Sequence, residues 1–141
     1  MKIKPENHTF VICAYKESPY LEECIRSLKN QSVRTNLRMA TSTDNGHIRA
    51  LAEKYGIPLD INPGPGGITQ DWNFAYSRAG TPLITLAHQD DVYCRDYAKE
   101  ILACAARAKR PLILFSDYGE IRNGARVREN MLLKIKRMML I

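Results

Sequence analysis

The chain lacks the sequence features of several protein classes. In its 141 residues no apolar run approaches the roughly 20 residues of a membrane-spanning helix, and its start lacks the apolar segment of a signal peptide. Its four cysteines form no Cys-x-x-Cys pair and three lie in apolar patterns, which favours reduced thiols over disulfides or a zinc site. Basic residues are scattered without interleaved aromatics, which argues against nucleic acid as a partner. We therefore expect a cytoplasmic protein.

The chain does carry a formal net charge of +6, and much of the excess lies in residues 126–141. This charge suits an anionic partner such as a nucleotide or a lipid headgroup. With 45% hydrophobic and 26% charged residues, its composition is that of an ordinary globular protein. The length predicts a single domain over residues 1–141 with a sizeable core.

Short apolar runs alternate with segments of helical periodicity. The apolar runs cover residues 9–15, 37–41, 57–61, 83–87 and 112–116. The helical patterns cover residues 18–28, 44–55, 68–79 and 95–109. Strands separated by helices predict an α/β fold with three α/β/α layers and a mostly parallel, Rossmann-like central sheet. After residue 116, Asn123-Gly124 predicts a hairpin and residues 130–141 a basic, apolar C-terminal helix.

The apolar run at residues 83–87 leads directly into His88, Gln89, Asp90 and Asp91. Ligands bind at the carboxyl ends of strands in open α/β sheets, and adjacent carboxylates there can hold Mg²⁺ or Mn²⁺ against a substrate diphosphate. Alternatively, the two aspartates only cap the following turn and helix. The role of His88 stays open between metal ligand, diphosphate contact, proton carrier and structural group.

Two other segments offer ligand contacts. The loop at residues 64–67 precedes a helix and can present N–H groups to phosphate, although it matches neither standard glycine motif and a flexible turn explains it equally well. Asp71 and Asn73 on that helix either reach the same pocket or face water. Tyr15 and Glu17 follow the first strand, where α/β sheets receive a nucleotide, and Tyr15 either stacks on a base or packs against its neighbours.

Taken together, three stretches in this order and spacing resemble the family 2 glycosyltransferases of GT-A fold. They are residues 10–28, 66–73 and 86–93, within a resemblance that covers residues 9–115. The resemblance implies a donor such as a UDP- or TDP-sugar, a divalent metal, and a saccharide or lipid-linked acceptor. It also suggests a role in cell-wall or capsular polysaccharide biosynthesis.

By position, the resemblance assigns a nucleotide-sugar site and a metal site. The nucleotide-sugar residues would be Cys13, Ala14, Tyr15, Glu17, Thr41, Ser42, Gly66, Gly67, Asp71, Asn73, His88, Gln89 and Asp90. The metal would be held by Asp90, with Asp91 beside it. Two departures stand out: His88 replaces the first aspartate of the family's Asp-x-Asp motif, and the acidic pair that usually reads the base is missing. Thr41 or Ser42 could hydrogen-bond the base instead.

In inverting members of this family a general base lies downstream of the metal motif, but neither Asp117 nor Glu120 matches a base motif. We therefore interpret the chain as the donor-binding half of a longer enzyme, with a core at residues 9–116 and residues 117–141 leading to a missing acceptor part. The basic C-terminal segment suits the inner face of a membrane, or equally a core helix without its partner. Alternative functions are a non-catalytic nucleotide- or partner-binding module and a nucleotidyltransferase.

Overall fold

The structure, a computed structural model, describes residues 3–127 and 131–139. It divides into two compact units, Met1–Lys109 and Arg110–Ile141, and each is described by itself. None of the described helices combines the length and the apolar character that crossing a bilayer requires.

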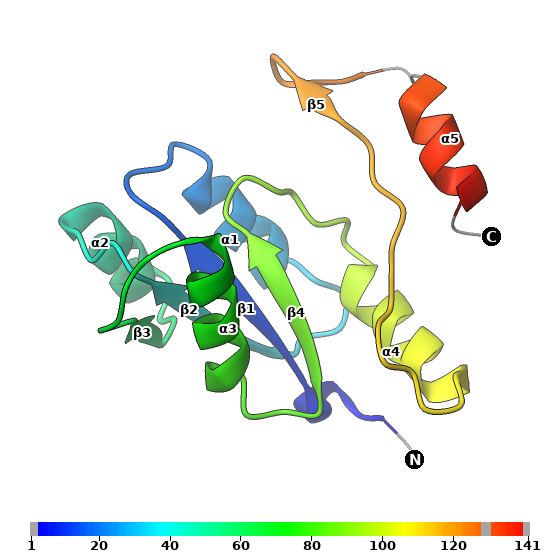
Figure 1. The fold of residues 1–141 in the computed structure, drawn as a ribbon, viewed down its shortest axis with the longest axis horizontal. Helices are drawn as coiled ribbons and strands as arrows, with labels where there is room; N and C mark the ends of the chain where they lie inside the picture. The colour runs from blue at the N-terminus through cyan, green and yellow to red at the C-terminus, as the bar shows by residue number, and fades with distance from the viewer. Residues whose placement is uncertain (1–2, 128–130, 140–141) are drawn as a thin grey trace. The chain divides into compact units, whose positions relative to one another are not determined.

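The first unit is built on a sheet of four parallel strands in the order β3-β2-β1-β4 (Figure 1). The strands are β1 (His8–Ala14), β2 (Asn36–Thr41), β3 (Leu59–Ile61) and β4 (Leu83–His88). In this register Cys13 lies opposite Ala40 on one side and His88 on the other. The carboxyl ends of the three longer strands therefore meet at one edge of the sheet.

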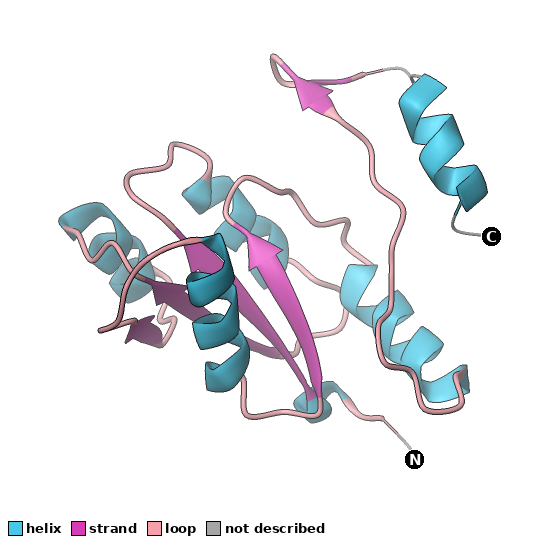
Figure 2. Ribbon diagram, in the orientation of Figure 1, coloured by secondary structure: helices cyan, strands magenta, loops and turns pink. Residues whose placement is uncertain are grey.

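Helices cover both faces of this sheet, which confirms the predicted three-layer α/β class (Figure 2). They are α1 (Leu21–Lys29), α2 (Gly46–Lys54), α3 (Ile68–Arg78) and α4 (Tyr97–Arg107), after a short 3₁₀ turn, η1 (Pro5–Asn7). One apolar cluster joins β1 to α1, α2 and α4, and a smaller one joins it to α3.

Strand β1 is the centre of the packing because both of its faces are covered. Phe10, Ile12 and Ala14 belong to the larger cluster, whereas Val11 packs with Cys13 in the smaller one. A strand buried on both sides has no need of polar positions, which explains the continuous apolar run in the sequence.

Helix α3 approaches the sheet through small side chains. Ala75 and Ala79 are buried against Val11 and Ala40. Tyr76, which helical spacing predicts on the same side, is instead 63% exposed. The side of α3 that faces the sheet is therefore formed by the alanines together with Phe74, and Tyr76 lies outside it.

Local signals set the limits of α2. The Asn45 side chain accepts a hydrogen bond of 3.0 Å from the Ile48 backbone N–H, as an N-cap does, and Gly56 follows the helix with a φ of +60°. The start of α1 differs from the helical pattern at residues 18–28. Pro19 lies in a turn, and α1 begins only at Leu21.

The predicted fifth strand at residues 112–116 is wrong. This run has no regular structure, and its Leu112 and Phe115 side chains are 95% and 72% exposed. It follows Arg110, whose φ of +56° turns the chain, and Pro111, which has no N–H to donate. A β-prone run becomes a strand only when a neighbour takes its backbone hydrogen bonds, and none of the described residues does so here.

In the second unit the predicted hairpin and helix are confirmed. Strands β5 (Ile121–Arg122) and β6 (Ala125–Arg126) pair in antiparallel fashion, and α5 covers Met131–Met139. The turn residues Asn123 and Gly124 have φ values of +52° and +75°. Two consecutive positive φ angles are what a two-residue hairpin of matching twist requires, and Asn-Gly adopts them readily.

Candidate functional site

A cavity of about 650 Å³ lies at the carboxyl ends of β1, β2 and β4, beside the start of α3. Its lining consists of Cys13, Ala14, Tyr15, Ser42, Thr43, Gly66, Gly67, Ile68, Asp71, Trp72, His88, Gln89 and Asp90. The size is that of a small-molecule site, and the position is where open α/β sheets bind ligands.

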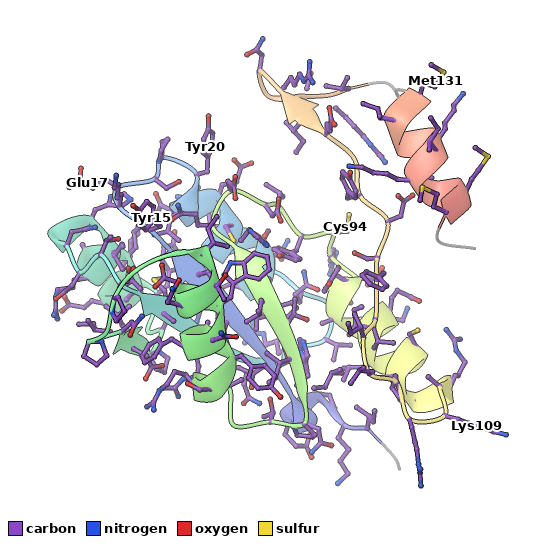
Figure 3. All side chains as sticks on the ribbon, viewed as in Figure 1. Tyr15, Glu17, Tyr20, Cys94, Lys109 and Met131 are labelled. Carbon is purple, nitrogen blue, oxygen red and sulfur yellow. The ribbon has the colours of Figure 1, made fainter. Side chains whose placement is uncertain are left out.

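The cavity brings together the predicted nucleotide-sugar residues except Glu17, Thr41 and Asn73. Figure 3 shows Glu17 on the loop after β1, farther from the sheet than Tyr15. Thr41 is buried, and its hydroxyl accepts a 3.0 Å hydrogen bond from the Thr43 backbone N–H. Asn73 is an exposed residue of α3.

Three lining residues were not predicted: Thr43, Ile68 and Trp72. Trp72 is 38% exposed, and its ring meets the His88 ring edge to face, with centroids 4.9 Å apart. Ile68 and Trp72 are four residues apart, so they share one helix face at the start of α3. This spacing, directly after a glycine loop, is the sequence signal that could have identified Ile68 and Trp72 as lining residues.

Thr43 joins two of the loops that form the cavity. Its hydroxyl accepts a 2.5 Å hydrogen bond from the backbone N–H of Lys16, which has a φ of +53°. A positive φ at a residue other than glycine is costly and needs support from its surroundings. Thr43 supplies that support and holds the loop after β1 against the loop after β2.

The acidic turn after β4 is anchored through the carbonyl of His88. This oxygen accepts hydrogen bonds of 3.2 Å from the Asp91 N–H and 3.2 Å from the Cys24 thiol of α1. Burial, assisted by the charges of Asp91 and Asp90, raises the pKa of Cys24 to about 12, so the thiol keeps its proton and remains a donor.

The two aspartates of this turn are not equivalent. Asp90 lines the cavity and Asp91 does not. Burial raises the pKa of Asp91; the nearby His88 opposes this shift and the charge of Asp90 adds to it. Of the two, only Asp90 is therefore placed to meet a molecule bound in the cavity.

Gln89 is engaged with the opposite strand end. Its side-chain oxygen accepts from the Tyr15 N–H at 2.9 Å, and its side-chain nitrogen donates to the Tyr15 carbonyl at 3.0 Å. Both hydrogen-bonding groups of the amide are thus used within the protein.

Asp71 fixes the glycine loop. Its carboxylate accepts hydrogen bonds from the Ser42 hydroxyl at 2.9 Å, the Asn62 amide at 3.3 Å and the Gly67 N–H at 3.4 Å. Gly67 has a φ of +146°, which favours glycine, and a Cβ at Gly66 would lie 3.0 Å from the Ser42 hydroxyl. The loop therefore needs glycine for conformation at one position and for space at the other.

The cavity thiol is not an activated nucleophile. Burial, with a further contribution from the charge of Asp71, raises the pKa of Cys13 to about 11. A reactive cysteine needs the opposite shift, which stabilises the thiolate.

The metal prediction can be compared with the donor atoms in the cavity. Within the described ranges, no three side chains of His, Cys, Asp or Glu gather into a metal-binding group. The cavity offers the Asp90 carboxylate beside the His88 imidazole. Mg²⁺ is commonly held by one or two carboxylates together with substrate phosphates and water, so this donor set fits a metal that arrives with a diphosphate.

The two weak candidates for a general base lie in the second unit. Asp117 forms a 2.8 Å ion pair with Arg137, and the hydrogen bond from Arg137 is the main reason that its pKa is lowered. The Glu120 carboxylate forms an ion pair with the Arg122 guanidinium, with an N–O distance of 3.3 Å. A general base works best with a pKa near the operating pH, so the shift of Asp117 is in the wrong direction. Glu129, the last acidic residue, lies outside the described residues.

Comparisons with known proteins show what this architecture is similar to. One solved structure, of S. aureus TarS, is 18% identical with a TM-score of 0.58, over 68% of this chain and 19% of that chain. Another, of the mannosyltransferase PcManGT from Pyrobaculum calidifontis in complex with GDP-Man and Mn2+, is 16% identical with a TM-score of 0.62, over 74% of this chain and 35% of that chain. At these identities the likeness shows the fold, which confirms the GT-A class.

No curated protein sequence matches the chain. The chain spans only 19% and 35% of the lengths of the two solved structures. The model of the family described as glycosyl transferase family 2, however, matches residues 9–135, which is most of the chain and includes every residue of the cavity lining. The chain belongs to glycosyl transferase family 2.

Proposed function

We propose that the cavity binds the nucleotide-diphosphate sugar of a glycosyltransferase, and that this chain is the donor-binding half of that enzyme. The observation that carries the proposal is the position of Asp90: in a family 2 chain, it lines a cavity of ligand size at the carboxyl edge of the sheet. The complex of the mannosyltransferase neighbour with GDP-Man and Mn2+ supports a donor of this chemical class.

The lining residues suggest how the donor would be held. Tyr15 is 48% exposed and would offer its ring to the nucleoside, and the Ser42 hydroxyl, which also lines the cavity, would hydrogen-bond the base. Asp90 would hold Mg²⁺ or Mn²⁺ and His88 would face the diphosphate. When bound, the metal supplies positive charge that stabilises the leaving diphosphate.

The finer parts of the proposal concern the whole enzyme. It would transfer the sugar from a UDP- or TDP-donor to a saccharide or lipid-linked acceptor, in cell-wall or capsular polysaccharide biosynthesis. Residues 117–141 would lead to the acceptor part. The basic α5, with Lys134, Lys136 and Arg137, would suit an anionic membrane surface at the cytoplasmic face.

Calorimetry with the full chain tests donor binding. UDP, TDP and GDP are titrated with and without Mn²⁺ into the wild type and into Asp90→Asn, Asp91→Asn and Glu53→Gln. Glu53 is an exposed residue of α2 outside the cavity lining, so its variant controls for the loss of one negative charge. We expect Asp90→Asn to weaken binding in the presence of Mn²⁺ by at least about tenfold, and Glu53→Gln to leave it unchanged.

Absence of binding by the wild type to all three nucleotides would refute the proposal, as would equal affinities of wild type and Asp90→Asn. A larger loss in Asp91→Asn than in Asp90→Asn would move the metal to Asp91. Release of pyrophosphate from a nucleoside triphosphate would favour a nucleotidyltransferase instead.

A further inference from the structure

The end of the β1–β4 ladder is completed by a side chain instead of by backbone. The two strands run parallel from the pair His8 and Leu83 to the pair Cys13 and His88. One residue after the last strand residue of β4, the chain turns away, and the side-chain amide of Gln89 takes the place of a further peptide group. It gives Tyr15 one acceptor and one donor, as a neighbouring strand would.

Only one orientation of this amide is compatible with its partner. Tyr15 presents a backbone N–H and a backbone C=O, so the oxygen of Gln89 must face the first and its nitrogen the second. The reversed amide would place two donors together and two acceptors together. The pair is therefore a specific two-point contact between residues 74 positions apart in the chain.

This contact lies inside the candidate site. Tyr15 and Gln89 both line the cavity, and so do their chain neighbours Ala14 and Asp90. A residue whose amide already binds the Tyr15 backbone cannot use the same groups on a ligand. It can, however, fix the positions of the two strand ends that border the cavity.

We propose that Gln89 is a positioning residue that joins the ends of β1 and β4 and thereby holds Tyr15 in place for the nucleotide. The ligand part of this proposal rests on the proposed function, whereas the joining of the two strand ends does not. The role requires a side chain with one donor and one acceptor at this reach. Methionine has the reach with neither group, and glutamate has acceptors only.

Amide hydrogen exchange and nucleotide affinity test the proposal together in the full chain. Gln89→Met and Gln89→Glu are compared with wild type and with Gln70→Met, a matched change at an exposed glutamine outside the cavity lining. NMR measures exchange of the Tyr15 amide, calorimetry measures affinity for UDP and GDP with Mn²⁺, and urea unfolding measures global stability.

We expect exchange at Tyr15 to become at least about tenfold faster in both Gln89 variants, and nucleotide affinity to fall at least about fivefold, more than the loss of global stability accounts for. Exchange within twofold of wild type would show that the contact does not hold Tyr15 and would overturn the proposal. Faster exchange with unchanged affinity would overturn its ligand part. If wild type binds no nucleotide, the proposed function fails, and exchange alone still decides whether Gln89 joins the strand ends.

Discussion

Replacing Asp71 by alanine should loosen the glycine loop and destabilise the first unit. The carboxylate is the shared acceptor for Ser42, Asn62 and Gly67, which belong to the loop after β2 and to the loop before α3. No other described side chain joins both loops in this way. Alanine keeps the helical backbone of α3 intact, so the effect isolates the carboxylate.

The expected magnitude follows from the three distances. A hydrogen bond to a charged group contributes about 1.5–3 kcal/mol when well formed, and the 2.9 Å bond from Ser42 qualifies. The bonds at 3.3 Å and 3.4 Å are long, and together they add about as much as one weak bond of roughly 0.5–1 kcal/mol. A carboxylate in the first turn of α3 contributes about a further 0.5 kcal/mol. We therefore expect Asp71→Ala to lower the free energy of unfolding by about 3 kcal/mol.

Urea unfolding followed by circular dichroism measures this change, and a double-mutant cycle with Ser42→Ala isolates the 2.9 Å bond. The coupling energy of the two changes should be about 1.5–3 kcal/mol, the range given above for this bond. Asp44→Ala is the matched control, because the ion pair of Asp44 with Arg49 lies on the surface and should contribute less than about 1 kcal/mol. A loss below about 0.5 kcal/mol for Asp71→Ala, or a coupling energy near zero, would refute the reasoning.

Two further predictions use His8 and Trp72. His8 is buried between the hydroxyls of Thr35 and Thr85, and burial lowers its pKa from 6.5 to about 4. Between these pH values the unfolded chain binds more protons than the folded one, so the free energy of unfolding should fall by about 3 kcal/mol as the pH drops from about 6.5 to about 4. Urea unfolding of His8→Gln should show a smaller fall over the same pH range. The same pH dependence in wild type and His8→Gln would contradict this prediction. Trp72 is the single tryptophan and touches His88, so its fluorescence should change when UDP or GDP binds with Mn²⁺. Trp72→Ala should weaken the nucleotide affinity measured by calorimetry more than Trp72→Phe, which keeps a ring beside the imidazole. Equal losses of affinity in the two variants would show that the ring contact is irrelevant.

The sequence predicts the structure correctly where local chemistry determines the conformation of the chain. The buried strand β1 is a continuous apolar run because both of its faces are covered, and Asn123-Gly124 turns a hairpin because these residues accept positive φ angles. The parallel register then brings the strand ends together, so most predicted site residues meet in one cavity.

The features that the sequence did not predict have a common cause: each depends on contacts with residues far away in the chain. The run at residues 112–116 is β-prone, but propensity does not supply a neighbouring strand. Trp72 lines the cavity and contacts the ring of His88 at the end of β4, a contact that helical spacing alone does not reveal. Gln89 contacts Tyr15, 74 positions away, and Asp71 contacts Ser42, 29 positions away, which is beyond any local pattern.

These distant contacts reduce the number of cavity-lining side chains whose polar groups can bind a ligand. Gln89 and Asp71 have the residue types expected of ligand contacts, yet their polar groups bind the protein itself and hold loops together. In the part of the chain that the structure describes, Asp90 and His88 line the cavity without a hydrogen bond from their side chains to the protein. A diphosphate bound in the cavity would therefore meet the Asp90 carboxylate and the His88 imidazole, whose ring contacts Trp72, where the family pattern has two aspartates.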